Sequence, residues 1–173
     1  MQVEILIAGS GGQGIILMSN IIGAAATLQG MFATQVSTYG SAQRSTPVHT
    51  EIVISNRPVK FPFVQKPDFF IVMSHQGFNE FSRRMGEDTL VFIDLDRAKD
   101  VKLDCQGKYI SLSASGIAKE IGNPIGANFV MLGKFLSTTE IIPLKIVEEA
   151  IIQNTPEQFI KKNLEAVRKG NTI

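Results

Sequence analysis

Residues 3 to 20, VEILIAGSGGQGIILMSN, decide the fold of this chain. Val3 to Ala8 is short, rich in β-branched side chains and almost continuously apolar, which is typical of a strand buried on both faces of a parallel sheet. A glycine-rich turn and a long helix are expected to follow. Gly9, Gly11 and Gly14 have the G-x-G-x-x-G spacing that binds a dinucleotide pyrophosphate between a strand and a helix. The stretch therefore predicts an α/β fold and raises the question of an NAD or FAD site.

Strand-like and helix-like segments alternate along the rest of the chain. Short β-branched or aromatic runs between turn residues predict strands, and longer segments predict helices. This alternation predicts a single α/β domain over residues 1–173, a three-layer Rossmann-like domain with a mostly parallel sheet. The further strands are expected at Ala33–Ser37, Thr50–Ser55, Phe69–Met73, Leu90–Ile93 and Lys108–Leu112, and the helices at Gln13–Gln29, Gln76–Met85, Ala114–Ile121, Ala127–Leu136, Pro143–Gln153 and Pro156–Lys169.

The last expected helix carries signals at both ends. Thr155 is predicted to be its N-cap, with Pro156 in the first turn and Gln158 completing a capping box. Gly170 is predicted to stop the helix.

The glycine loop lacks the partners that nucleotide sites require. A dinucleotide fold usually places an Asp or Glu about 20 residues beyond the loop to bind the ribose, and no acidic residue occurs between Ile5 and Thr50. A P-loop is excluded because Ile15 and Ile16 follow Gly14 where Lys and Ser or Thr would stand. Two interpretations remain: a tight turn, or an anion site made by backbone N–H groups at the helix start.

Composition and charge exclude several classes of protein. Lys plus Arg total 17 against 16 for Asp plus Glu, which predicts neither nucleic-acid nor membrane binding. The sequence starts without a signal-peptide pattern, and its longest apolar stretch, Ile15–Leu28, is shorter than the roughly 20 residues that span a bilayer. We therefore expect a cytoplasmic protein. The single cysteine, Cys105, excludes an internal disulfide and an iron–sulfur cluster held by this chain alone.

A second unusual stretch, STYGSAQRSTPVHTEIVIS at residues 37–55, places Tyr39 and Arg44 between two expected strands. Gly40 and Pro47 argue against a helix there, so we expect an ordered loop. The planar guanidinium of arginine suits a carboxylate or a phosphate. An ion pair across a subunit contact is an equal alternative.

Six segments in order carry a resemblance to a known family: GSGGQGI near the start, YG followed by Arg44, EIVIS, PDFFIVM, NFVMLG at Asn128–Gly133 and NLEAVRKG at Asn163–Gly170. Over essentially its whole length, the chain resembles the gamma subunit of 2-oxoacid:ferredoxin oxidoreductases. These are the pyruvate, 2-oxoglutarate and ketoisovalerate enzymes. Indolepyruvate oxidoreductases have a similar small subunit, and AQR at residues 42–44 is similar to their loop.

The resemblance implies a subunit of an enzyme that decarboxylates a 2-oxoacid with thiamine diphosphate and magnesium, reduces ferredoxin through iron–sulfur clusters and forms an acyl-CoA. 2-Oxoglutarate or pyruvate is the expected substrate, with 2-oxoglutarate favoured. The thiamine site and the clusters belong to the partner subunits, which are alpha and beta, with delta in some enzymes. The gamma subunit is expected to be non-catalytic alone and to bind no dinucleotide, and whether it forms a homodimer when isolated is left open.

Two segments are predicted to contact CoA or the catalytic subunits. The first is the helix start with Gly11, Gly12, Gln13 and Gly14, and the second is the loop with Tyr39 and Arg44. Both should follow strands at the carboxyl ends, where open α/β sheets bind ligands. The family usually has two glycines after the loop arginine, where this chain has Ser45-Thr46 and then Pro47. These side chains restrict any close approach to the backbone.

Other polar residues receive structural interpretations. His75 follows a strand without an identifiable nucleophile or carboxylate, and His49 is interpreted as a strand-end surface or interface residue. Asp94 and Asp96 are expected to cap the next loop rather than bind a metal, and Cys105 lacks the surroundings of a reactive thiol. The rival hypothesis for the whole chain is a free-standing Rossmann-like module that binds a nucleotide or a phosphorylated metabolite.

Overall fold

The structure, a computed structural model, describes residues 1–38, 47–99, 101 and 108–173. Its strands are β1 (Gln2–Ser10), β2 (Phe32–Thr38), β3 (Pro47–Ser55), β4 (Phe69–Val72), β5 (Leu90–Asp94) and β6 (Tyr109–Leu112). Its helices are α1 (Ile15–Leu28), α2 (His75–Phe81), the short 3₁₀ helix η1 (Ser82–Arg84), α3 (Ala114–Glu120), α4 (Ala127–Thr139), α5 (Leu144–Asn154) and α6 (Glu157–Asn171). Every expected strand and helix is present, with bounds that differ by a few residues.

The strands form one six-stranded sheet in the order β2-β3-β1-β4-β5-β6. β1, β4, β5 and β6 are parallel neighbours, whereas β3 is antiparallel to both β1 and β2. β2 therefore runs in the same direction as β1. The reversal at β3 follows from the short connection between β2 and β3, because a crossover to a parallel strand needs a dozen or more residues. The prediction of an α/β fold with a mostly parallel sheet is confirmed.

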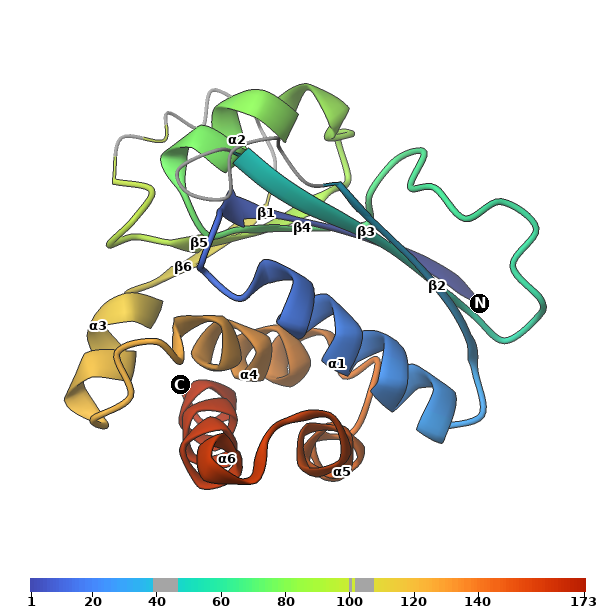
Figure 1. The fold of residues 1–173 in the computed structure, drawn as a ribbon. Helices are drawn as coiled ribbons and strands as arrows, with labels where there is room; N and C mark the ends of the chain where they lie inside the picture. The colour runs from blue at the N-terminus through green and yellow to red at the C-terminus, as the bar shows by residue number, and fades with distance from the viewer. Residues whose placement is uncertain (39–46, 100, 102–107) are drawn as a thin grey trace.

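Helices cover the two faces of the sheet unequally (Figure 1). On one face, α1 packs over β1, β2 and β3, α4 contacts β5, and α5 and α6 form a further layer against α1 and α4. On the other face, α2 and η1 give a thinner cover. β1 serves both cores, since Ile5 and Ile7 belong to the larger cluster and Leu6 and Ala8 to the smaller one. This two-sided burial explains its continuous apolar sequence.

The predicted ends of the last helix were wrong. Pro156, not Thr155, is the N-cap of α6, and no side chain caps its first turn. The hydroxyl of Thr155 is buried with no hydrogen-bond partner in the described part of the chain. α6 also continues through Gly170 to Asn171. A Cβ atom at Gly170 would collide with the carbonyl oxygen of Val130 in α4, so this glycine permits close packing of two helices and does not end one.

Candidate functional site at the carboxyl edge of the sheet

The glycine loop joins β1 to α1, and two of its glycines have left-handed backbone conformations. Gly12 has φ 87° and Gly14, the N-cap of α1, has φ 71°. Side chains rarely adopt this region, which explains the glycines at these two positions. The expected helix start at Gln13 therefore moves to Ile15. A Cβ atom at Gly14 would also collide with the side chain of Asn128.

The side chain of Gln13 connects the ends of two strands. Its Oε1 accepts a hydrogen bond from the backbone N–H of Ser10 at 2.6 Å, and its Nε2 donates to the carbonyl oxygen of Met73 at 2.8 Å. Ser10 ends β1, and Met73 follows β4 on the neighbouring parallel strand. The amide of Gln13 thus fixes the glycine loop against β4.

Asn128 supports the same loop from α4. Its Nδ2 donates to the carbonyl oxygen of Gly14 at 3.2 Å, and the residue is only 2% exposed. Its Oδ1 has no hydrogen-bond partner among the described residues. The start of α4, within the NFVMLG segment, therefore positions the start of α1.

The two predicted site segments start from the same edge of the sheet. Gly11, Gly12, Gln13 and Gly14 lie together after β1. Tyr39 and Arg44 lie outside the described residues, but the strands that flank them, β2 and β3, are described. Ser10 of β1 is in register with Pro47 of β3, and Thr38 of β2 is in register with His49 of β3. The end of β2 and the start of β3 are thus beside the end of β1.

An open depression of about 490 Å³ lies next to the glycine loop. It is at a topological switch point, because the chain passes from β1 to α1 on one face and from β4 to α2 on the other (Figure 1). Open α/β sheets bind ligands in such crevices. Its lining, which among the described residues includes no acidic side chain, comprises Ser10, Gly11, Gln13, Ser74, His75, Gln76 and Arg97.

Arg97 is a lining residue that sequence reasoning missed. Its Nε donates to the hydroxyl of Ser115 at 2.8 Å, and this hydroxyl donates to the fully buried carboxylate of Asp94 at 2.6 Å. The buried carboxylate of Asp94 therefore orients the guanidinium of Arg97 through the hydroxyl of Ser115. The sequence did contain a signal for Arg97. This residue directly follows IDLD at the end of an expected strand, on the edge of the sheet where ligands were expected to bind.

Asp94 and Asp96 support the start of α3, whereas the sequence predicted that they would cap the loop directly after the strand. Asp94 accepts hydrogen bonds from both the hydroxyl and the backbone N–H of Ser115. Asp96 accepts from the hydroxyl of Ser113 at 2.6 Å and from the backbone N–H of Gly116 at 2.7 Å. The hydrogen bond from Ser113 is the main cause that lowers the pKa of Asp96. Within the described ranges, no three His, Cys, Asp or Glu side chains come together as a metal site, and Cys105 lies outside those ranges.

The two histidines are placed differently. His75 is half-buried at the start of α2, where its Nε2 lies 3.4 Å from Nδ2 of Asn79 and its backbone N–H donates to the carbonyl oxygen of Arg97. The side chain of His49 is only 15% exposed, and its ring centroid lies 4.2 Å from that of Phe81. The surface interpretation of His49 is therefore wrong, and the interface interpretation stays a prediction. Burial, together with the charge of Arg84, lowers the pKa of His49 against the opposing effect of Glu51.

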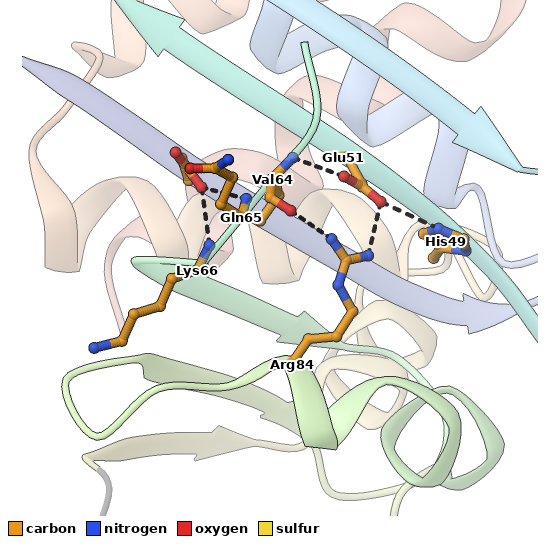
Figure 2. Close-up of polar contacts among 7 residues, drawn as sticks. His49, Glu51, Val64, Gln65, Lys66 and Arg84 are labelled. Atoms are coloured by element: carbon orange, nitrogen blue, oxygen red, sulfur yellow. Dashed lines mark hydrogen bonds and ion pairs between the residues drawn. The ribbon is translucent and has the colours of Figure 1, made fainter. Parts of the chain in front are cut away.

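A buried ion pair on β3, opposite the middle of β1, was also missed (Figure 2). The carboxylate of Glu51, 6% exposed in β3, lies 2.7 Å from Nη1 of Arg84 and accepts a hydrogen bond from the backbone N–H of Val64 at 2.7 Å. Burial raises the pKa of Glu51, but the hydrogen bonds from Arg84 and Val64 outweigh it and lower the pKa overall. The sequence alternation in TEIVIS gave no sign that Glu51 would be covered.

Comparisons with known proteins decide the family. The family model for pyruvate ferredoxin/flavodoxin oxidoreductase matches residues 4–173. The chain belongs to this family. It is 36% identical to 2-oxoglutarate synthase subunit KorC from Methanocaldococcus jannaschii, over 100% of this chain and 94% of that protein.

Solved structures agree with this assignment. The gamma subunit of a keto/oxoacid ferredoxin oxidoreductase from Geobacter sulfurreducens matches with a TM-score of 0.84 and 27% identity, over 98% of this chain and 94% of that one. A 2-oxoglutarate:ferredoxin oxidoreductase from Magnetococcus marinus has the same fold, with a TM-score of 0.88 and 20% identity, over 99% of this chain and 30% of that longer chain. The protein is thus a gamma subunit of a multi-subunit 2-oxoacid:ferredoxin oxidoreductase, as the resemblance implied. In the described part of this gamma subunit, no helix is long and apolar enough to cross a membrane.

Proposed function

We propose that this gamma subunit serves a cytoplasmic oxidoreductase that converts 2-oxoglutarate to its acyl-CoA, and that the carboxyl edge of its sheet contacts CoA. The full-length similarity to a 2-oxoglutarate synthase subunit supports the choice of substrate. The structure from Magnetococcus marinus with CoA and succinyl-CoA bound makes CoA the ligand to test. Pyruvate is the alternative substrate, after the name of the family.

Resemblance to the family is the basis on which we assign the chemistry to the subunits. Thiamine diphosphate with magnesium supplies the decarboxylation and the iron–sulfur clusters pass electrons to ferredoxin, and we assign both to the alpha and beta subunits, with delta where it is present. The residues of this chain bind and orient. Backbone N–H groups of the glycine loop and the start of the 14-residue helix α1 suit a phosphate group of CoA.

The depression beside the glycine loop carries this proposal. Arg97 brings a cation that Asp94 and Ser115 hold in place, and the described lining has no carboxylate to repel an anion. Arg44 lies outside the described residues, between the end of β2 and the start of β3 in the sequence, and we assign it to a second phosphate or to the catalytic subunits. Gln13 is assigned a positioning role, because its amide is already bonded to Ser10 and Met73.

Replacing Arg44 with alanine in the assembled enzyme tests the proposal. Charge-assisted hydrogen bonds to phosphate contribute about 1.5–3 kcal/mol, so KM for CoA should rise roughly tenfold or more. Arg83→Ala is the matched control, because Arg83 is exposed on η1 away from the depression. Unchanged kinetics of a normally assembled Arg44→Ala enzyme would remove Arg44 from the site.

Arg97→Lys and Arg97→Ala test the depression itself. Lysine keeps the charge but not the planar group that Ser115 orients, so Arg97→Lys should raise KM for CoA less than Arg97→Ala does. Equal KM values for CoA in both variants and the wild-type enzyme would show that CoA does not use this depression.

A further inference from the structure

The connection between β3 and β4, residues 56–68, exposes two aromatic side chains. Phe61 is 51% exposed and Phe63 is 46% exposed, and their rings pack on each other with centroids 5.4 Å apart. The connection forms an arch that projects near the N-terminus in Figure 1. Ser55, where the arch begins, is in register with Gln2, so the arch lies at the opposite end of β1 from the glycine loop.

The arch is held rigidly beside these two rings. The carboxylate of Glu4 accepts hydrogen bonds from the backbone N–H groups of Gln65 at 2.7 Å and Lys66 at 3.1 Å. Glu51 accepts from the N–H of Val64, and Arg84 donates to the carbonyl oxygen of Val64 at 2.7 Å (Figure 2). Three consecutive backbone amides therefore bind buried or half-buried carboxylates. A segment fixed in this way loses little conformational entropy when a partner binds it.

A hollow of about 510 Å³ continues from the two rings toward the start of β1. The cationic side chains of Arg57 and Lys60 line it together with Met1, which is 64% exposed. Glu4 lies in the same lining, but its carboxylate is already bonded to the arch. The surface thus offers aromatic side chains among positive charges, and a complementary partner offers apolar side chains among carboxylates.

A protein partner fits this surface better than a nucleic acid. The whole chain has 17 basic against 16 acidic residues, without the basic excess of a nucleic-acid-binding domain. The family acts as a multi-subunit enzyme, so large partner surfaces are available. Exposed aromatic side chains with arginine nearby are typical of the cores of protein interfaces.

We propose that the surface made by Met1, Arg57, Lys60, Phe61 and Phe63, here called the aromatic arch, docks a larger subunit of the same oxidoreductase. The segment that it binds carries apolar side chains flanked by Asp or Glu. This inference rests on membership of the oxidoreductase family and is independent of the CoA site. In this proposal the two ends of β1 have different roles. The aromatic arch binds a partner subunit, and the carboxyl edge of the sheet remains accessible to CoA.

The first test compares assembly of the complete set of subunits with two variants of this chain. Phe61→Ser/Phe63→Ser removes the exposed rings, and Ile152→Ser is the matched control, since Ile152 is 51% exposed on α5. The arch variant should bind its partners at least about tenfold more weakly, as expected for the loss of interface anchors. The thermal unfolding of the isolated chain should be unchanged. Wild-type affinity of the arch variant, or an equal loss in the control, would overturn the proposal.

A photo-crosslinking residue at position 61 identifies the occupant. We expect a cross-link to a larger subunit in the intact enzyme and none from the same residue placed at position 152. A cross-link only to ferredoxin, only to a second copy of this chain, or to nothing would overturn the proposal. CoA-dependent turnover of the wild-type complex, measured in the same preparation, tests the proposed function separately.

Discussion

The two ends of β1 are fixed by different chemistry. At its carboxyl end the glycine loop is held by the neutral amides of Gln13 and Asn128. Toward its amino end, the connection between β3 and β4 that carries the aromatic arch is held by the carboxylates of Glu4 and Glu51. Because both amides are neutral, they place no negative charge beside the position where we propose that a phosphate of CoA binds. Carboxylates suit the arch, because they bind several backbone amides at once.

The largest effect should come from breaking the ion pair that supports the arch. Arg84→Met leaves the carboxylate of Glu51 buried with only the N–H of Val64 and His49 beside it. Removing one partner of a buried pair costs about 3–5 kcal/mol, and the partial exposure of Arg84 reduces this to about 3 kcal/mol in the free energy of unfolding. Chemical denaturation measures it, with the exposed neighbour variant Arg83→Met as control.

Hydrogen exchange locates the damage in the same variant. The amide of Val64 should exchange much faster in Arg84→Met, whereas the amide of Ser10 at the glycine loop should keep its protection. Equal loss of protection at both amides would show that the two ends of β1 are not held independently.

The next effect compares two glycines that both have positive φ angles. Alanine at Gly12 meets no atom within 4 Å, so Gly12→Ala should cost only the left-handed backbone strain of about 1–2 kcal/mol. Gly14→Ala has the same strain and also pushes on Asn128, and should therefore cost about 1 kcal/mol more. Thermal unfolding of the two variants measures the difference, and equal costs would show that Asn128 moves aside freely.

A smaller effect is expected at Gln13. Gln13→Ala leaves the N–H of Ser10 and the carbonyl oxygen of Met73 without their partner, which should cost about 1–2 kcal/mol of unfolding free energy. Gln158→Ala on the exposed face of α6 is the control and should change stability by less than about 0.5 kcal/mol. A Gln13→Ala protein as stable as the control would mean that water replaces the amide.

The smallest effect is the pH dependence of the unfolding free energy that comes from Glu51 in β3. The pKa of Glu51 is lower in the folded state, so the folded state gains stability from ionised Glu51 above the unfolded pKa near 4.5 and loses it as pH falls through the folded pKa. Glu51→Gln removes this contribution, so the stability difference between wild type and variant should narrow as the pH falls from 7 to 3. Unfolding titrations at each pH measure this, and a constant difference would contradict the ionised pair.

The sequence predicted the fold well because its signals are local. The apolar run at Val3 to Ala8 and the glycines after it are read within one strand and one turn, and the structure has both. Gly170 was misjudged because its reason lies in α4, where the carbonyl of Val130 leaves no room for a side chain. Glycine at a helix end and glycine at a helix crossing look alike in a single sequence.

The candidate site was predicted only in part, for a similar reason. The loop after β1 and the segment after β2 could be assigned to one edge from strand direction alone. Arg97 could not, because its orientation depends on Ser115 and Asp94, and Ser115 comes 18 residues later in the chain. Glu51 and Arg84 are 33 residues apart and come together only because α2 and η1 pack over the sheet beside β3.

Anaerobic purification of the tagged protein from its native cells shows whether this chain works as the gamma subunit of a CoA-dependent 2-oxoacid:ferredoxin oxidoreductase. The eluate is assayed for dye reduction with a panel of 2-oxoacids, with and without CoA. We predict that larger subunits with iron–sulfur absorbance co-elute and that 2-oxoglutarate drives CoA-dependent reduction. A chain that elutes alone and inactive while binding a nucleotide would contradict the account.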